Sequence, residues 1–397
     1  MDLKPSLKRY DAGGRRRLVV VSALGVVEIL TWGSSFYLPA VLAGPIVRDT
    51  GWPLAGVVGG LTLGLLVAAF ASPYVGAAIH RRGGRPVLIL AALLLTSGLT
   101  IVAMAPGLPV YLAGWLVMGL GMGCGLYDPA FATLGRLYGA EARPAITTLT
   151  LWGGFTSTIC WPLSGFLVGQ IGWRGTCLAY AGLHLVLTLP LVLTLIPSVQ
   201  TQRETLGSAA FTDAPFPVDR RLFLLFAGVL VLGGAVMSIV SVHLLALLQA
   251  RGVPLTSAIS YGALIGPAQV AARVIEMSNK GRHHPLWTLT AALSLITLGI
   301  GLLTAGIPGL GVWLVLYGSG NGIYSIARGT VPLVLFGPER YAVLVGRLAR
   351  PGLVAQALAP SLGAFVLVRG GVDALFVLLV GLALSNLGMV VALWRVR

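Results

Sequence analysis

The sequence predicts an all-α membrane protein with twelve transmembrane helices in two pseudo-symmetric six-helix bundles. Three observations predict this fold class: 56% of the 397 residues are hydrophobic, only 10% are charged, and long apolar stretches recur along the chain. A soluble domain carries about 25% charged residues. The apolar stretches must be helical, because lipid offers no hydrogen-bond partner to an unpaired backbone group.

Twelve segments are long enough to cross a bilayer, which takes about 20 mostly apolar residues. The first follows a basic N-terminal segment but is too long for the apolar region of a signal peptide, so we expect it to be retained. Several exceed 25 residues and are expected to tilt or to protrude from the lipid. The expected spans are residues 18–46, 54–79, 86–105, 109–137, 144–169, 174–196, 222–249, 255–278, 286–305, 309–336, 342–368 and 373–394.

The basic residues gather on one side of the predicted membrane. When the connecting segments alternate between two sides, 21 of the 27 Lys and Arg fall with the two termini, four fall opposite and two lie within spans. Basic loops mark the cytoplasmic side, so we predict a multi-pass inner-membrane protein with both termini in the cytoplasm. The net charge of +15 is therefore a topology signal with anionic lipid as its partner, and no nucleic-acid binding is expected.

A polar stretch in the middle of the chain separates six spans from six. It predicts a cytoplasmic N-terminus at 1–17, bundles at 18–196 and 221–397, and a cytoplasmic linker at 197–220. The two bundles show signs of an internal duplication, as many transporter folds do. A shift of 198 residues aligns Trp115 with Trp313, Gly139 with Gly337, Glu141 with Glu339, Pro162 with Pro360 and Gly165 with Gly363.

The loop after the second span resembles the signature loop of the major facilitator superfamily. Residues 76–85 read GAAIHRRGGR and match the family pattern at two glycines and two arginines. His80 stands where the family usually has aspartate, and Arg136 stands where an acidic partner is common. The usual gate is therefore expected to be altered in this chain. The residues assigned to the gate motif are Gly76, His80, Arg81, Gly83, Arg85 and Arg136.

Two further stretches, residues 50–53 and 266–273, resemble the monocarboxylate and oxalate–formate branch of the superfamily. That branch holds a carboxylate with an arginine of span eight, and Arg273 matches its place. The lysines that some members carry in spans one or eleven have no counterpart here. The resemblance implies a secondary transporter that rocks one half against the other. An ion gradient must supply the energy, since the sequence contains no nucleotide-binding loop.

The ionisable residues Glu28, Asp128, Arg273 and Arg328 lie within the predicted spans. Each costs roughly 2.5–3.5 kcal/mol at the bilayer centre on insertion scales, so pairing, a wet cavity or neutralisation is expected. In the superfamily, spans one, four, seven and ten line the central cavity. The resemblance places Glu28, Asp128, Arg328 and His243 on those spans.

We predict that Glu28 and Asp128 couple transport to protons, because burial favours the protonated form of a carboxyl group; a hydrogen bond from Glu28 to a neighbouring helix is the alternative. Three roles stay open for Asp128 and Arg328: an ion pair between the halves, substrate binding by Arg328, or structural pairing. Arg273 is either a substrate anchor or half of a local ion pair with Glu276. His243 is either a ligand contact or a satisfied polar residue. The residues expected to bind substrate are Arg328, Arg273, His243, Trp32, Tyr37, Tyr127, Asn321 and Tyr324.

The predicted function is proton-coupled transport of a small organic solute, with an organic anion favoured. A proton-driven exporter of cations or multiple drugs is one alternative, and a non-transporting sensor or accessory protein of the same fold is another. The sequence contains no catalytic constellation and no metal motif, so we expect no enzymatic activity, metal or cofactor. We expect a monomer whose partners are a small-molecule substrate, protons and membrane lipid.

Overall fold

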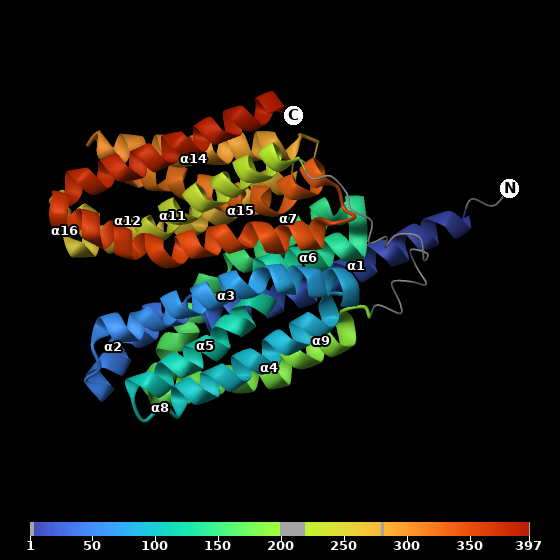
Figure 1. Ribbon diagram of the computed structural model, residues 1–397, viewed down its shortest axis with the longest axis horizontal. Coiled ribbons are helices and arrows are strands. Elements are labelled where there is room, and N and C mark those ends of the chain that lie inside the picture. Colours follow the sequence, from blue (N-terminus) through green and yellow to red (C-terminus); the bar gives the residue numbers. More distant parts are fainter. Residues whose placement is uncertain (1–3, 199–218, 279–281, 397) are drawn as a thin grey trace.

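The computed structural model describes residues 4–198, 219–278 and 282–396, and it describes side chains from residue 16 onward. Helices make up most of these residues, and no strand occurs among them. The linker expected at 197–220 falls almost entirely outside the described residues. Its two ends lie at the same end of the molecule as the N-terminus (Figure 1).

The helices form two bundles, which Figure 1 shows one above the other. The N-terminal half contains α1 (Lys4–Gly33), α2 (Leu38–Thr50), α3 (Leu54–Arg82), α4 (Gly84–Ala103), α5 (Leu108–Gly125), α6 (Tyr127–Tyr138), the 3-10 turn η1 (Gly139–Glu141), α7 (Ala142–Gly154), α8 (Thr156–Leu183), the π-helical turn η2 (His184–Thr188) and α9 (Leu189–Leu195). The C-terminal half contains α11 (Arg220–Ala250), α12 (Leu255–Ala263), α13 (Ile265–Ser278), α14 (Pro285–Thr304), α15 (Leu310–Phe336) and α16 (Tyr341–Val396).

These helices make the twelve predicted spans. Eight described segments are long and apolar enough to cross a membrane. Two of them are compound: Leu108–Leu195 contains three spans and Tyr341–Val396 contains two, so the eight segments give eleven spans. The twelfth is α15, which carries Asn321 and Arg328 in its interior. The predicted fold class is confirmed.

Single glycines reverse the chain inside the two longest helical segments. Gly172 in α8 has φ 69° and ψ 178°, and Gly371 in α16 has φ 75° and ψ −172°. Such a backbone conformation is open essentially to glycine alone. The arms on either side of Gly172 pack against each other, since Ser164 and Tyr180 share a hydrogen bond of 2.7 Å.

Prolines interrupt three of the spans. Pro39, Pro129 and Pro267 each lack the N–H that would bond to the carbonyl four residues earlier, and each ring crowds that carbonyl. Accordingly, α5 ends at Gly125 and α12 ends at Ala263, each four residues before its proline, while the turn between α1 and α2 covers residues 34–37. Spans one, four and eight are therefore discontinuous near the middle of the molecule.

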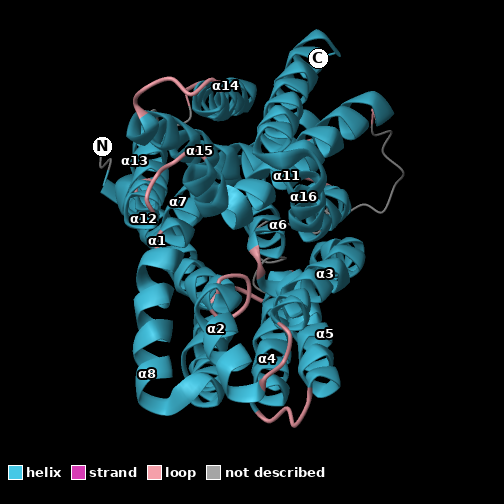
Figure 2. Ribbon diagram, turned by 90° about the vertical axis from the view of Figure 1, so that its left-hand side faces the viewer, coloured by secondary structure: helices cyan, strands magenta, loops and turns pink. Residues whose placement is uncertain are grey.

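We call the end that carries the loops at Gly83, Gly139 and Gly337 the linker side, and the end that carries Gly172 and Gly371 the far side. The halves meet mainly where α3 and α6 contact α16 and where α7 contacts α13 and α15. Figure 2 shows α3 and α16 on opposite sides of this boundary. The far-side helices α2 and α12 pack mainly within their own halves. The halves are thus joined at the linker side and the centre.

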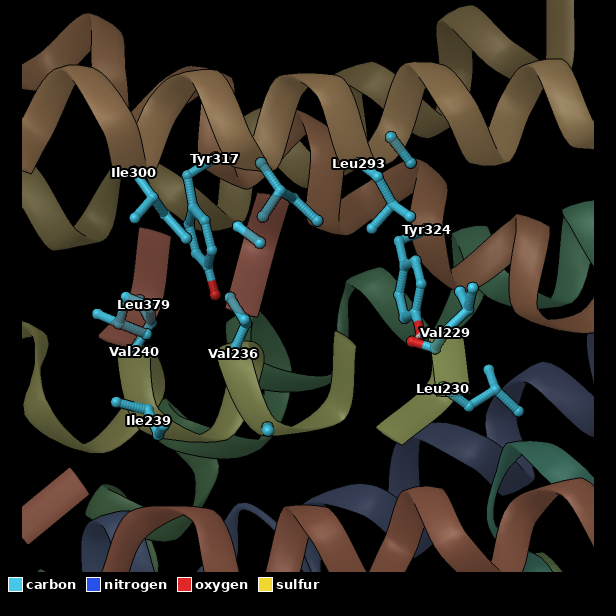
Figure 3. Close-up of a cluster of buried hydrophobic side chains, with 14 of the residues drawn as sticks. Val229, Leu230, Val236, Ile239, Val240, Leu293, Ile300, Tyr317, Tyr324 and Leu379 are labelled. Carbon is cyan, nitrogen blue, oxygen red and sulfur yellow. Dashed lines mark hydrogen bonds between the residues drawn. The ribbon is translucent and has the colours of Figure 1, made fainter. Parts of the chain in front are cut away.

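The C-terminal half has an apolar core of its own, whereas the buried clusters of the N-terminal half also include α15 and α16 residues such as Leu333 and Leu353. In the C-terminal half, Tyr317 and Tyr324 of α15 lie against α11 residues such as Val236 and Val229 (Figure 3). Burying a large apolar side chain contributes about 1.5–3 kcal/mol in water. In lipid that driving force is absent, and close packing and hydrogen bonds carry the association of helices. Apolar packing and polar groups therefore both hold the two halves together.

A polar cluster between the two halves

The interruption of span four places two polar residues at a helix N-terminus in the middle of the membrane. α5 ends at Gly125, Leu126 is extended with ψ −173°, and Tyr127 and Asp128 form the first turn of α6. Backbone N–H groups at this end of a helix carry a partial positive charge, which favours a carboxylate. The Asp128–Pro129 pair thus breaks the span and places the Asp128 carboxylate at the N-terminus of α6.

Asp128 is joined to the other half by an ion pair with Arg328 of α15, whose Nη2 donates to Asp128 Oδ2. The two side chains are only 10% and 16% exposed. Unlike the pairs Arg17–Glu141 and Arg251–Asp373, this one links the halves through the centre. The contact between the halves, one of the three roles expected for these residues, is present in the structure.

Glu28 lies on α1 close to this ion pair. Its side chain is fully buried, and Trp32 Nε1 donates to its Oε2 at 2.9 Å. Its Oε1 has no hydrogen-bond partner among the described residues. Glu28 and Asp128 are near enough to interact electrostatically. Glu28 therefore combines a fixed orientation with one oxygen that remains able to accept a proton or a hydrogen bond.

Aromatic rings surround Trp32 at the interruption of span one. The ring centroid of Trp32 lies 5.1 Å from Tyr127, 5.2 Å from Phe36 and 6.1 Å from Tyr37. Tyr37 in turn meets Trp161 of α8 edge-on at 6.1 Å. Ring pairs at these separations are mutually attractive. The break between α1 and α2 thus presents an aromatic wall beside Glu28.

Arg273 of α13 approaches the same region from the C-terminal half. It is 5% exposed, and its Nε donates to the Gly322 carbonyl at 3.1 Å and to Ser325 Oγ at 3.2 Å. Its Nη1 has no hydrogen-bond partner within the described chain. That nitrogen packs against Gly154 of α7, where a Cβ atom would lie only 2.3 Å away. Arg273 therefore reaches across the boundary with part of its guanidinium unused.

The charge of Arg273 acts on the aromatic wall. It interacts electrostatically with the hydroxyl groups of both Tyr37 and Tyr127. Tyr127 also interacts with Glu28 and Arg328. The structure thus gathers Glu28, the Asp128–Arg328 pair, Arg273 and the aromatic rings into one cluster drawn from both halves.

The local ion pair expected between Arg273 and Glu276 is not among the ion pairs of the described residues, and that expectation was wrong. Arg273 turns to α15, whereas Glu276 Oε1 accepts a hydrogen bond of 2.7 Å from Thr288 of α14. Residues three apart share a helix face, but each side chain finds a nearer partner on a different neighbouring helix. Glu276 instead interacts electrostatically with Arg143 in the other half.

Of the other residues expected to bind substrate, His243 and Tyr324 bond within the C-terminal half, although Tyr324 also interacts electrostatically with Asp128 and Arg328. His243 Nε2 donates to the Pro360 carbonyl at 2.9 Å, which ties α11 to α16. The Tyr324 hydroxyl donates to the Val229 carbonyl at 3.2 Å and points into the core of its own half (Figure 3). Asn321 is partly buried on α15, with no partner for its Oδ1 among the described residues. His243 and Tyr324 are thus engaged within the C-terminal half.

The predicted gate residues lie on the linker side. The last turn of α3 contains His80 and Arg81, and the helix ends at Gly83 (φ 79°), whose N–H donates to the Ile79 carbonyl. Arg136 lies in the last turn of α6. Arg85 donates to the Leu193 carbonyl and so holds α4 to α9.

A pair of glycines brings the backbones of the two halves into direct contact. A Cβ atom on Gly76 would lie 2.5 Å from the Ala342 carbonyl, and one on Gly346 would lie 2.5 Å from the Ser72 carbonyl. Small residues allow such backbone contact between membrane helices. Nearby, Tyr341 of α16 is fully buried against Gly135 of α6. The linker side is therefore closed by backbone packing between α3 and α16.

The cavity enclosed beside the Asp128–Arg328 pair is small. It measures about 10 Å³ and is lined by Trp32, Ser72, Tyr127 and Leu353 together with the pair itself. A space of this size holds about one water molecule. In this conformation the ion pair is closely packed, and an organic substrate has no room beneath it.

Comparison with known proteins agrees with this architecture. The family model of the Major Facilitator Superfamily matches residues 24–348. The chain belongs to this superfamily. The members of this superfamily are membrane transporters, not enzymes.

Curated superfamily relatives include monocarboxylate transporter 11. The human protein is 30% identical over 272 residues, which cover 66% of this chain and 54% of the relative. The mouse protein is 29% identical over 323 residues, which cover 77% of this chain and 67% of the relative. The chain thus matches little more than half the length of the human relative. A purine ribonucleoside efflux pump of Salmonella typhimurium is 32% identical over 140 residues, or 35% of each chain.

Solved structures of superfamily members share the fold. The human organic anion transporter MFSD10 superposes with a TM-score of 0.72 over 94% of this chain and 99% of that chain, at 18% identity. The proton:xylose symporter XylE gives a TM-score of 0.72 over 96% of both chains, at 10% identity. These similarities establish the arrangement of helices.

Several residues of this cluster were missing from the sequence prediction. Phe36 and Trp161 complete the aromatic wall, Ser325 orients Arg273, and Gly154 makes room for it. Phe36 could have been found from its place beside Tyr37 in the interrupted part of span one. Gly154 carried no signal of its own, because glycine is abundant throughout this chain.

Proposed function

We propose that this transporter moves a small organic anion with a carboxylate group, held between the halves by Arg273. The observation that carries the proposal is the buried guanidinium with an unpartnered Nη1 at the boundary. A buried charge without a carboxylate partner is costly, and guanidinium groups match carboxylates in geometry. The carboxylate of a substrate would supply the missing partner.

The aromatic wall supports the same proposal. Small-molecule sites are mostly apolar with a few polar anchors. Trp32, Phe36 and Trp161 would contact the hydrocarbon part of the substrate, and the hydroxyls of Tyr37 and Tyr127 would lie near its charged end. The similarity to monocarboxylate transporter 11 and to the organic anion transporter MFSD10 favours this substrate class.

We assign Arg328 to conformational switching. Its charge is already compensated by Asp128 across the boundary, whereas Arg273 has no carboxylate partner and is therefore the better site for an anionic substrate. The pair would form when the linker side is closed and break when the halves rock apart there. Each chain contains both halves, so we propose that it works as a monomer.

The proposed orientation follows from charge. The linker side carries most of the basic loop residues, such as Arg81, Arg82 and Arg340. Basic loops stay in the cytoplasm. Both termini would then be cytoplasmic, in a bacterial-type inner membrane. The conformation described here, closed on the linker side, would face outward.

We propose that Glu28 carries the coupling proton. It is buried, held by Trp32, electrostatically coupled to Asp128, and has one oxygen without a partner in the described residues. In a reconstituted system, Glu28→Gln should abolish uphill transport but retain substrate exchange. Unchanged uphill transport would remove Glu28 from the coupling mechanism.

The substrate assignment is tested in liposomes that contain a pH dye and are supplied with a panel of labelled monocarboxylates. A charge-assisted hydrogen bond contributes about 1.5–3 kcal/mol, so Arg273→Gln should raise KM roughly 10- to 150-fold. The matched variant Arg328→Gln should instead lower the transport rate with a smaller effect on KM. An unchanged KM in Arg273→Gln would contradict the proposal.

An exporter of organic cations is the second candidate, because the free oxygen of Glu28 lies beside the indole of Trp32. Carboxylates and aromatic faces both attract cations. Cation export should survive Arg273→Gln and be lost in Glu28→Gln, together with substrate exchange. The same liposome panel, extended to cationic dyes, separates the two functions.

A further inference from the structure

A broad apolar groove opens on the surface of the N-terminal half, where its spans face lipid. It is formed by α3, α4 and α5 and encloses about 800 Å³. That volume is comparable with sites that hold drug-sized ligands. Its lining is almost wholly apolar and includes Phe70, Tyr74, Leu90, Leu94, Leu120 and Cys124.

An arginine from the opposite half lies at the edge of this groove. The guanidinium carbon of Arg350, on α16, lies 4.8 Å from the ring centroid of Phe70. Phe70 is 55% exposed and also lines the groove. The groove therefore ends at the seam between the halves, with a cation of the C-terminal half above it.

A second exposed arginine lies one turn nearer the linker side. Arg347 precedes Arg350 by three residues, so the two share a helix face, and both are exposed. α3 and α16 run in opposite directions, so Tyr74, one turn after Phe70, lies on the Arg347 side of the ring. Tyr74 is 79% exposed. The guanidinium groups of Arg347 and Arg350 and the phenol of Tyr74 therefore lie together at the linker-side end of the groove.

These arginines need an anionic partner. Arg350 lies about 14 Å along α16 from its start at Tyr341, at 1.5 Å per residue, so it is inside the span. A cation at such depth is costly unless it is paired or reaches the interface. Neither arginine is in an ion pair within the described part of the chain. The partner with access to this surface is the headgroup of a lipid.

We propose that an anionic phospholipid of the linker-side leaflet binds at this seam. Its phosphate contacts Arg347 and Arg350 near the hydroxyl of Tyr74, and an acyl chain lies in the apolar groove along α3. The groove belongs to one half and the arginines belong to the other. The lipid therefore bridges the halves beside the Gly76–Gly346 contact and favours the conformation that is closed on the linker side, because a ligand shifts a population towards the state that it binds better.

Binding is tested by native mass spectrometry of the purified full chain. Phosphatidylglycerol and phosphatidylcholine with the same acyl chains are added in turn. Each basic residue near an anionic headgroup contributes enough for roughly a fivefold change in affinity, so Arg347→Ala/Arg350→Ala should weaken phosphatidylglycerol binding about 25-fold. Leu120→Trp, which fills the groove, should weaken binding of both lipids.

The matched control is Arg369→Ala. Arg369 is also an exposed arginine of α16 over an aromatic ring, 5.5 Å from the centroid of Phe365, but it lies on the far side, away from the groove. This variant should bind phosphatidylglycerol like the unaltered protein. The proposal would be overturned if Arg369→Ala lost as much phosphatidylglycerol binding as the double arginine variant. It would also be overturned if the unaltered protein bound phosphatidylglycerol and phosphatidylcholine equally well.

The conformational part is tested in nanodiscs of phosphatidylcholine with and without phosphatidylglycerol. Phosphatidylglycerol should increase the fraction closed on the linker side, and the double arginine variant should lose that response. Cross-linking of two chains in the variant Tyr74→Cys would also overturn the proposal, because the surface around the groove would then be a contact between two copies of the protein. Neither readout uses a transport substrate, so failure here would leave the proposed anion transport untouched.

Discussion

Removal of the negative charge from Asp128 should open the linker side of the transporter. In the closed conformation, Asp128 and Arg328 are largely buried and bonded to each other across the boundary. Asp128→Asn leaves the Arg328 guanidinium buried without its counter-charge. When the halves separate on the linker side, water reaches Arg328 and the penalty disappears. The substitution therefore destabilises one conformation and not the other.

The size of the effect follows from the burial of the pair. Loss of one partner of a buried ion pair costs about 3–5 kcal/mol. The side chain of Arg328 is 16% exposed, so we take the lower end of that range. About 3 kcal/mol corresponds to a shift of roughly 150-fold in the equilibrium between the two conformations. A double variant, Asp128→Asn/Arg328→Gln, removes both charges and should recover most of this shift.

The assay is pulsed EPR with spin labels at Arg82 and Glu339, exposed residues on the linker side of the two halves. Asp128→Asn should move the distance distribution to longer values. Asp373→Asn is the matched control, since Asp373 pairs with Arg251 at 3.1 Å but is 90% exposed. Exposed pairs contribute about 0–1 kcal/mol, so the control should leave the distribution unchanged.

Two results would refute this reasoning. The first is an unchanged distance distribution in Asp128→Asn, which would mean that the pair does not hold the linker side closed. The second is a double variant shifted as far as the single one. In that case the loss of packing, and not the unpaired charge of Arg328, would be the cause.

Three further predictions concern contacts that shape the transport cycle. Gly346→Ala places a methyl group 2.5 Å from a carbonyl of α3, so it should disfavour the conformation closed on the linker side by about 1–3 kcal/mol. Faster labelling of a cysteine introduced on the linker side would show this shift. Gly165→Ala, where the methyl group meets nothing within 4 Å, is the control. Tyr341→Phe loses the hydroxyl bond of 2.5 Å to a carbonyl of α15 and should cost about 0.5–1.5 kcal/mol of stability in a thermal unfolding assay. His243→Ala loses the bond to the Pro360 carbonyl and should lower the unfolding temperature while KM stays within about twofold, whereas a large rise in KM would place His243 in the substrate site.

Much of the fold was predictable from sequence because lipid imposes a simple rule. A span must be about 20 apolar residues long and must bond its own backbone, so composition alone locates its ends. The interruptions were also visible in part, since the sequence places a helix-breaking proline directly after Asp128 in span four. The single-glycine reversals at Gly172 and Gly371 were not, because the chain is rich in glycine and φ cannot be recognised from residue type.

The site was predicted less completely than the fold. The charged residues were found because a charge inside a membrane is costly and needs an explanation. Their partners depend on how each helix is rotated, and sequence spacing does not report that rotation. Arg273 illustrates the limit: its spacing from Glu276 favoured a local pair, but its Nε bonds to α15 instead. Asp128 and Arg328 form an ion pair between the halves, which was one of their three expected roles, because the two spans face each other across the boundary.

The reversals at Gly172 and Gly371 bear on how the protein enters its membrane. Each joins two spans with no intervening loop, so the translocation machinery cannot release the first span of the pair and insert the second later. Spans five and six, and spans eleven and twelve, should therefore enter the bilayer together as preformed hairpins. Biogenesis would then depend on two single glycines, at positions where any other residue would strain the backbone of the turn before the transporter had folded.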